Sequence, residues 1–118
     1  MLMRARLLCI LNERLLLGEK GLFDNPKPVD LIEHLIKITQ QPKDALIMDF
    51  FAGSGTTFEA VANLNAEDGG TRRCISVQKA EDNLKNPEVP ISEVCRRRIK
   101  KVAENLNLPQ PVIFLSLR

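Results

Sequence analysis

Histidine and cysteine are scarce in this 118-residue sequence, and their positions exclude two common kinds of site. The three cysteines, Cys9, Cys74 and Cys95, lack the spacing of metal ligands and do not make an even-numbered disulfide set. Cys74 and Cys95 lie in apolar patterns, so we predict buried thiols in a reduced, cytoplasmic protein. The only histidine, His34, has no identifiable nucleophile or ligand partner, and we interpret it as a polar helix residue. The sequence therefore predicts neither a metal site nor a disulfide framework.

Charge of one sign and long apolar runs are also missing. The 17 basic and 15 acidic residues give a net charge of +2, too small for a strong electrostatic footprint on nucleic acid. No apolar run reaches the length of a membrane span, and polar residues at 12–14 interrupt the two apolar clusters near the N-terminus. We therefore expect no membrane association. Apolar residues make up 44% of the chain, enough for one small domain with a modest core.

The sharpest functional signal is the stretch Asp49–Thr57, with the sequence DFFAGSGTT. It follows the apolar run 45–48 and precedes a helical pattern, which is the order strand, glycine-rich turn, helix. Gly53 and Gly55 allow a tight turn and a close approach of the backbone to a ligand. The turn directs the free N–H groups of the next helix to the end of the strand, where Asp49 can accept a bond from a cation. These features predict a site for a ligand with an anionic or carbonyl end and an ammonium end.

Two other interpretations of this stretch are a flexible loop and a dinucleotide-binding turn. The loop is the usual meaning of an isolated pair of glycines, and Phe58 occupies the position of the third glycine of the dinucleotide motif. The full nine-residue run is more specific than either. It resembles the D-x-F-x-G-S-G-T-T signature of the DNA amino-methyltransferases that use S-adenosylmethionine, in the permuted group where this motif lies late in the chain.

The pattern along the chain predicts an α/β fold. We expect helices over 2–17, from Pro28 to about 38, over 57–65 and over 91–106, and strands over 45–50, 74–77 and 112–117. A helix between the first two strands makes them parallel. With the resemblance, this implies a partial Rossmann-like methyltransferase fold with about three parallel strands and flanking helices. We divide the chain into an N-terminal helix and linker, 1–22, and a cofactor-binding part, 23–118.

Three helices have predicted faces. Apolar residues of the helix after Pro28 are Leu31, Ile32, Leu35, Ile36 and Ile38, and those of the helix 57–65 are Phe58, Val61, Ala62 and Leu64. The helix 91–106 has the apolar stripe Ile91, Val94, Cys95, Ile99, Val102 and Leu106. Its other face carries Arg96, Arg97, Arg98, Lys100 and Lys101, which we interpret as a solvated face, with contact to DNA phosphates as the second interpretation.

Further segments support the resemblance, which covers roughly residues 15–106. The segment Phe23–Pro28 resembles the F-x-x-x-K-P element that precedes the glycine motif in permuted amino-methyltransferases. The segments 64–70 and 73–78 are similar to the modification subunits of type III restriction–modification systems. Those subunits also tend to have Gln after the second strand, as Gln78 is here, where nucleoside-binding folds usually have an acidic residue. Glu81 is a second candidate for that position, with a surface loop residue as the alternative.

The resemblance implies a cofactor site for S-adenosylmethionine. Asp49 and the backbone of Gly53 and Gly55 would hold its methionine part. The other residues assigned to the cofactor are Ser54 in the turn, Phe51 as a packing surface, Thr56 and Thr57 for the carboxylate, Gln78 for the ribose, and Phe23, Lys27 and Pro28 on the opposite side of the pocket. The family reaction moves the methyl group to N6 of an adenine flipped out of double-stranded DNA, and the type III likeness favours adenine over cytosine.

The family's catalytic motif, D/N/S-P-P-Y/F/W, is absent, because the sequence has no Pro-Pro pair and neither Tyr nor Trp. We therefore expect no catalytic residue here, and a partner that supplies the catalytic and target-recognition part, or a restriction subunit. One alternative is a non-catalytic remnant or regulatory module with the same fold. Another is a methyltransferase for RNA or protein, which the G-S-G-T-T form favours less.

Overall fold

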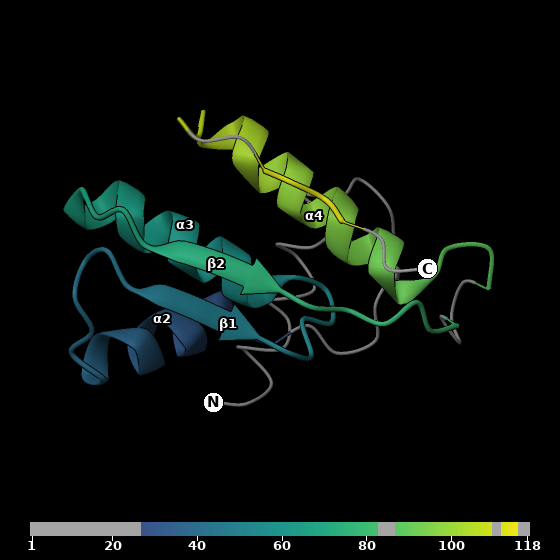
Figure 1. The fold of residues 1–118 in the computed structure, drawn as a ribbon, viewed down its shortest axis with the longest axis horizontal. Helices are drawn as coiled ribbons and strands as arrows, with labels where there is room; N and C mark the ends of the chain where they lie inside the picture. The colour runs from purple at the N-terminus through teal and green to yellow at the C-terminus, as the bar shows by residue number, and fades with distance from the viewer. Residues whose placement is uncertain (1–26, 83–86, 110–111, 116–118) are drawn as a thin grey trace.

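One pair of parallel strands organises the computed structural model, which describes residues 27–82, 87–109 and 112–115 (Figure 1). The elements follow in the order α2 (Val29–Ile38), β1 (Leu46–Asp49), α3 (Thr56–Asp68), β2 (Arg73–Ser76) and α4 (Ile91–Asn105). Leu46 lies opposite Arg73 and Asp49 lies opposite Ser76 in the parallel pair. The predicted unit of strand, helix and parallel strand is therefore confirmed.

Element boundaries differ from the prediction by a few residues. β1 is one residue shorter at each end than the predicted strand 45–50. α3 begins one residue earlier than predicted and continues to Asp68, where Gly69, at φ 69°, adopts the left-handed conformation that ends a helix. The Gly69 N–H donates to the carbonyl oxygen of Asn65 at 2.9 Å, so the polar residues after 65 complete the helix before the turn begins.

The third strand predicted over 112–117 is wrong where it can be examined. Residues 112–115 form no strand, and 116–117 lie outside the described residues. Phe114 instead lies with its ring centroid 5.3 Å from the guanidinium carbon of Arg96 on α4. The segment contacts a helix rather than a strand edge, so the described sheet has two strands. The predicted helix 2–17 and the site residue Phe23 also lie outside the described residues.

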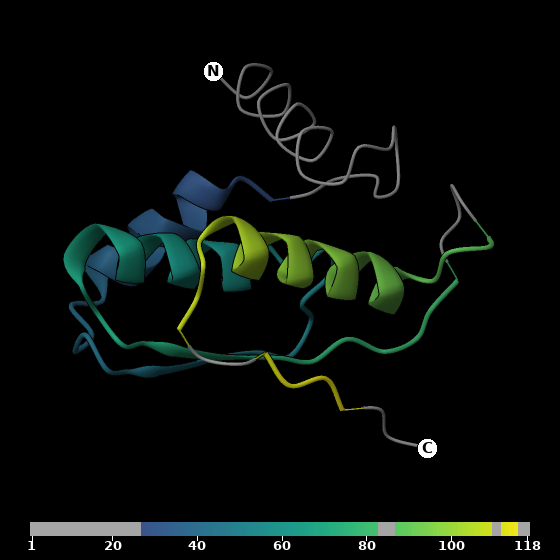
Figure 2. The same cartoon turned by 90° about the horizontal axis from the view of Figure 1, so that it is seen from above.

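All three described helices lie on one side of the strands (Figure 2). α3 is the central helix, since it contacts α2, β2 and α4. Four of its apolar side chains are almost fully buried, namely Ala60, Val61, Ala62 and Leu64. α2 is joined to α3 by hydrogen bonds from Asn63 to Glu33 and from Lys37 to Glu67, both at 2.9 Å. These contacts hold the strands, α3 and α4 in a fixed arrangement around the glycine turn.

The opposite face of the sheet carries Arg73 and three apolar side chains, and no described helix covers it. Alternation along the strands directs Ile47 and Cys74 toward the helices and directs Leu46, Met48 and Ile75 away from them. The last three side chains are 52%, 46% and 41% exposed. Parallel strands usually have both faces buried, which explains why these strands are apolar on both sides. No described helix lies against this second face (Figure 2).

The predicted helix faces are largely confirmed for α4 and partly for α2. Val94, Cys95, Ile99 and Val102 are buried along α4, whereas Leu106 is 37% exposed. In α2, Val29 is buried and Ile32 and Ile36 are half-buried, while Leu31, Leu35 and Ile38 are exposed. His34 is exposed on α2, as expected of a polar helix residue. Among the described residues, no helix is both long and apolar enough to cross a membrane.

Candidate functional site

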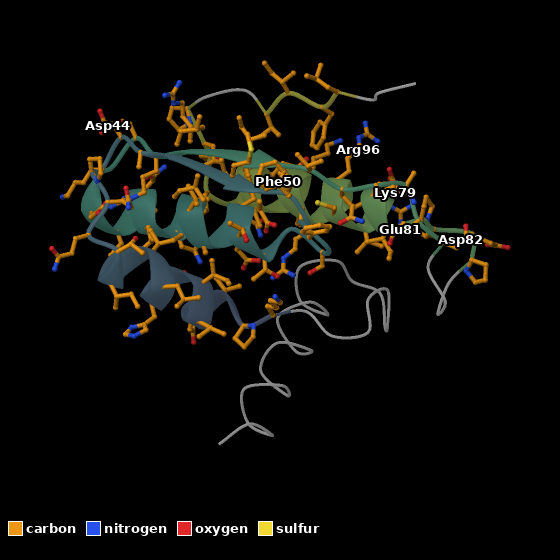
Figure 3. All side chains as sticks on the ribbon, turned by 60° about the horizontal axis from the view of Figure 1, so that its bottom comes forward. Asp44, Phe50, Lys79, Glu81, Asp82 and Arg96 are labelled. Atoms are coloured by element: carbon orange, nitrogen blue, oxygen red, sulfur yellow. The ribbon has the colours of Figure 1, made fainter. Side chains whose placement is uncertain are left out.

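Several of the predicted site residues meet at the carboxyl end of the sheet, namely Asp49, the residues of the glycine turn, Thr57 and Gln78. β1 ends at Asp49 and β2 at Ser76, and the glycine turn leads from β1 into α3. In Figure 3, Asp44 marks the opposite end of the sheet, while Lys79, Glu81 and Asp82 lie beyond the carboxyl end. Crevices at the carboxyl ends of parallel strands are the usual ligand sites of α/β sheets.

The glycine turn, residues 50–55, depends on two left-handed glycines. Gly53 has φ 55° and Gly55 has φ 86°, a region that residues with a Cβ rarely adopt. The Gly55 N–H donates to the carbonyl oxygen of Ala52 at 2.8 Å, which closes the turn. A Cβ on Gly55 would lie 3.4 Å from the sulfur of Cys95 and 3.4 Å from Ile99. α4 therefore packs directly against the turn, where Ala52 joins Cys95 and Ile99 in a small apolar cluster.

Asp49 is held by two internal hydrogen bonds. Its Oδ1 accepts the N–H of Phe51 at 3.0 Å, and its Oδ2 accepts the hydroxyl of Thr57 at 2.6 Å. An ionised carboxylate has about four acceptor sites, so two remain for a cationic ligand group. The Thr57 hydroxyl has its proton engaged by Asp49, and through this bond Thr57 fixes the carboxylate at the end of β1.

The first turn of α3 faces the site without a side-chain cap. Gly55 occupies the cap position and has no side chain to bond the first N–H groups of the helix. Thr56 is buried at 5% exposure, and its hydroxyl lies 3.4 Å from that of Ser54, which is 2% exposed. The hydroxyls of Ser54 and Thr56 thus lie inside the protein, and the backbone N–H groups are the donors left for an anion.

Gln78 closes the glycine turn from the second strand. Its Oε1 accepts the N–H of Gly53 at 2.7 Å, and its Nε2 donates to the carbonyl oxygen of Lys79 at 3.0 Å. The amide oxygen keeps a second lone pair for a ligand hydroxyl. Glu81 has an exposed side chain, and its carbonyl oxygen accepts the N–H of Ile91 at 3.1 Å. That bond joins the segment after β2 to the start of α4.

The side chains of the remaining predicted residues, Phe51, Lys27 and Pro28, make no hydrogen bond to Asp49, the glycine turn or Gln78 among the described residues, although the backbone N–H of Phe51 bonds to Asp49. Phe51 is 91% exposed, so its ring is free to pack on a ligand. Lys27 is exposed and Pro28 is half-buried, immediately before α2. Among the hydrogen bonds of the described residues, none connects Lys27 or Pro28 to the glycine turn. The structure therefore brings together Asp49, the turn, Thr57 and Gln78.

One prediction about α4 is wrong, and it concerns the site. Arg98 was placed on the solvated basic face, but it is 2% exposed, whereas Arg96, Arg97, Lys100 and Lys101 are exposed as expected. Its guanidinium binds Glu59 of α3, which is 8% exposed, and Ser54. The signal was in the spacing, because position 98 lies four residues after Val94 and four before Val102 on the buried stripe. A charged side chain on the buried side of a helix requires a partner of opposite charge, and the sequence analysis proposed none for Arg98.

Burial disfavours the thiolate form of the two described cysteines, and the Cys74 sulfur lies 3.6 Å from the hydroxyl of Ser76. Burial raises the pKa of the Cys95 thiol to about 11, although the charge of Arg98 lowers it in part. Burial also raises the pKa of Cys74. Both thiols are free; Cys95 is buried as predicted, and Cys74 is half-buried. Within the described part of the chain, no group of three or more His, Cys, Asp or Glu side chains is arranged to hold a metal ion.

Comparison with known proteins identifies a family and several relatives. A family model described as DNA methylase matches residues 10–89. The chain is 50% identical over 93 residues to the Mod subunit of the type III restriction–modification enzyme EcoPI of Escherichia phage P1. It is 42% identical over 97 residues to the StyLTI Mod subunit of Salmonella typhimurium, and 40% identical over 89 residues to the type II methyltransferase M.KpnI of Klebsiella pneumoniae.

These matches cover most of this chain and a small part of each relative. They include 74%, 77% and 70% of the chain, but 14%, 15% and 21% of the three relatives. The part matched by the family model, residues 10–89, contains β1, the glycine turn, α3 and β2. The similarity therefore concerns the region in which the hydrogen-bonded cluster lies.

Proposed function

The chain belongs to the DNA methylase family, and from this premise we propose that it is the S-adenosylmethionine-binding part of a DNA adenine-N6 methyltransferase. The observation that carries the proposal is the fixed pair of opposite electrostatic features at the end of β1. Asp49 presents a carboxylate, and the uncapped first turn of α3 presents N–H groups a few residues later. An amino-acid end, with an ammonium and a carboxylate group, matches this pair.

The residues present fit S-adenosylmethionine. We assign the ammonium group to Asp49, the ribose to Gln78 and a packing surface to Phe51. We assign the carboxylate to the uncapped first turn of α3, beside the backbone of Gly53 and Gly55, whose own N–H groups are bonded to Gln78 and Ala52. Ser54 and Thr56 support the turn from inside, and Thr57 acts through Asp49. Lys27 and Pro28, together with Phe23, are proposed to close the pocket from the other side. When bound, the cofactor supplies an electrophilic methyl group on a sulfonium centre.

The chain's own residues bind and orient, and the acceptor chemistry is proposed to come from another part. The sequence has no Pro-Pro-aromatic motif to hold an adenine amino group. The relatives extend far beyond the matched region, since it is 14% and 15% of the two Mod subunits. We propose that a catalytic and target-recognition part contacts double-stranded DNA, with a restriction subunit as a further partner. Adenine is favoured over cytosine by the likeness to Mod subunits.

A ligand titration of the purified chain tests the cofactor site. S-adenosylhomocysteine at ~100 times its dissociation constant should stabilise the fold by about 2.7 kcal/mol in thermal unfolding. Asp49→Asn should lose most of this shift, because it removes the charge that binds the ammonium group. Asp44→Asn is the matched control, since Asp44 is an exposed carboxylate at the opposite end of the sheet (Figure 3). No shift in a folded wild-type chain would contradict cofactor binding by this chain.

A methyl-transfer assay tests the division of labour. The chain alone should not methylate double-stranded DNA, because the motif that holds the target base is absent from its sequence. Methylation by the purified chain without any added protein would overturn the proposal that the catalytic group lies elsewhere. Binding of the cofactor without methylation is the result that we expect.

A further inference from the structure

A buried guanidinium lies directly behind the glycine turn. Arg98 of α4 donates from Nε to Oε2 of Glu59 at 2.7 Å, and its Nη2 lies 2.6 Å from the same oxygen. Its Nη1 donates to the hydroxyl of Ser54 at 3.0 Å. Arg98 and Ser54 are 2% exposed, and Glu59 is 8% exposed. One side chain thus joins α4, the first turn of α3 and the glycine turn.

Stability alone is a weak reason for such a pair. Removing two charges from water is costly, and replacing a buried ion pair by apolar side chains of similar size is often neutral or stabilising. What apolar side chains cannot reproduce is the third bond, to Ser54. Ser54 stands between the two left-handed glycines, where the backbone has the most freedom to change conformation. The bond from Arg98 restrains that freedom from inside the protein.

We propose that Arg98 is a positioning residue that sets the conformation of the glycine turn through Ser54, with Glu59 fixing the guanidinium. Arg98 does not touch the ligand, because it is buried behind the turn. Its consequence for ligand affinity rests on the proposed function, in which S-adenosylmethionine lies against the backbone of Gly53 and Gly55 and the uncapped first turn of α3. Its effect on the turn itself does not depend on any ligand.

Three variants separate positioning from simple packing. Glu59→Met/Arg98→Met replaces the ion pair by apolar side chains of similar length and removes both charges together. Ser54→Ala keeps the ion pair and removes the hydroxyl that accepts from Arg98, together with its 3.4 Å contact to the hydroxyl of Thr56. Arg97→Met is the matched control, since it removes an exposed arginine one position earlier, which pairs with Glu93 at 3.1 Å on the outer face of α4.

Amide hydrogen exchange measured by NMR on the whole chain reports on the turn without a ligand. The Gly55 N–H bonds to the carbonyl oxygen of Ala52 at 2.8 Å, so its exchange rate reports on the conformation of the turn. The Gly69 N–H bonds to the carbonyl oxygen of Asn65 at 2.9 Å at the other end of α3 and serves as the reference. Both Ser54→Ala and the double variant should speed exchange at Gly55 at least ~10-fold relative to Gly69. Arg97→Met should leave the ratio of the two rates unchanged.

The affinity for S-adenosylhomocysteine is the second readout, and it should fall about 10-fold in the same two variants, roughly the loss of one hydrogen bond to a charged group. If the Gly55 N–H exchanges at the wild-type rate in both variants, the positioning role is overturned, and the ion pair of Arg98 and Glu59 contributes only packing. If the double variant does not fold, Ser54→Ala decides by the same criterion. A wild-type chain that fails to bind S-adenosylhomocysteine would sink the proposed function, while the Gly55 exchange would still decide the role of Arg98.

Discussion

At the scale of single residues, the bond between Thr57 and Asp49 fixes the carboxylate that we assign to the ligand. It joins the end of β1 to the first turn of α3 over 2.6 Å. Thr57→Val keeps the shape of the side chain and removes the hydroxyl, so the carboxylate gains rotational freedom. We expect the affinity for S-adenosylhomocysteine to fall roughly 5-fold, the effect of one typical hydrogen bond. Calorimetric titration measures this, and Thr57→Ser, which keeps the hydroxyl, should retain the affinity.

A second residue-scale prediction concerns acid stability at the opposite end of α3. The hydrogen bonds from Arg72, at 2.9 and 3.0 Å, lower the pKa of Asp68 from 3.8 to about 2. A lowered pKa stabilises the fold above the unfolded value, and this contribution is lost as the pH falls from about 4 to about 2. Asp68→Asn should therefore lose part of the pH dependence of the unfolding midpoint in that window. Equal slopes for wild type and variant would contradict the prediction.

The sequence predicts which candidate site residues lie close together better than it predicts their hydrogen-bond partners. Asp49, Gly53, Gly55 and Gln78 were identified from the motif and from the strand ends, and they lie in one cluster. That Gln78 holds Gly53 depends on the register between β1 and β2, which the sequence does not state. The partners of Arg98, namely Glu59 and Ser54, likewise depend on how α4 packs across α3. Partners far apart in sequence are fixed by tertiary packing, and local patterns do not contain it.

At the scale of elements, α3 offers a comparison of its two ends. Both flanking glycines are left-handed, Gly55 at φ 86° and Gly69 at φ 69°. Alanine at either position should destabilise the fold by about 1–2 kcal/mol, the penalty of this conformation for a residue with a Cβ. Only Gly55→Ala should also weaken the binding of S-adenosylhomocysteine, because Gly55 lies at the site and a Cβ there meets α4. Thermal unfolding and calorimetry on both variants measure the two effects, and equal losses of affinity would refute the assignment.

Periodicity identified every described helix and both strands, since amphipathic patterns record which side of an element is buried. The strand predicted over 112–117 is wrong over the described residues 112–115, because an apolar run of strand length does not specify which strand it pairs with. Val112 packs against the cluster of Ala52, Cys95 and Ile99, and Phe114 meets Arg96, so these side chains are engaged by α4 and the turn. An apolar run becomes a strand only where a strand edge accepts its hydrogen bonds.

At the scale of the whole molecule, the uncovered face of the sheet governs behaviour in solution. Met48 and Ile75 are neighbours across the strands, and both are directed away from the helices. Exposed apolar faces of this kind favour association. We expect the chain to self-associate with rising concentration in light scattering or sedimentation. Met48→Glu/Ile75→Lys places opposite charges side by side on this face and should reduce association without unfolding the protein.

The matched control for this prediction is Ile47→Glu, since Ile47 faces the helices on the same strand. It should unfold the chain instead of dispersing it, because it introduces a charge beneath α3. A wild-type chain that stays monomeric at every accessible concentration would count against the role of the uncovered face.

The contact between Arg98 and the glycine turn also sets an order in time. The strands and α3 form one continuous segment, whereas Arg98 lies 39 positions from Glu59 and 44 from Ser54 along the chain. Contacts at long sequence separation form after local ones, since they require larger loops to close. During refolding, the helical signal of α3 should therefore precede the ability to bind S-adenosylhomocysteine, which stopped-flow mixing can resolve. In a chain still being synthesised, the residues of the glycine turn would therefore be present before α4 and Arg98 can fix their conformation.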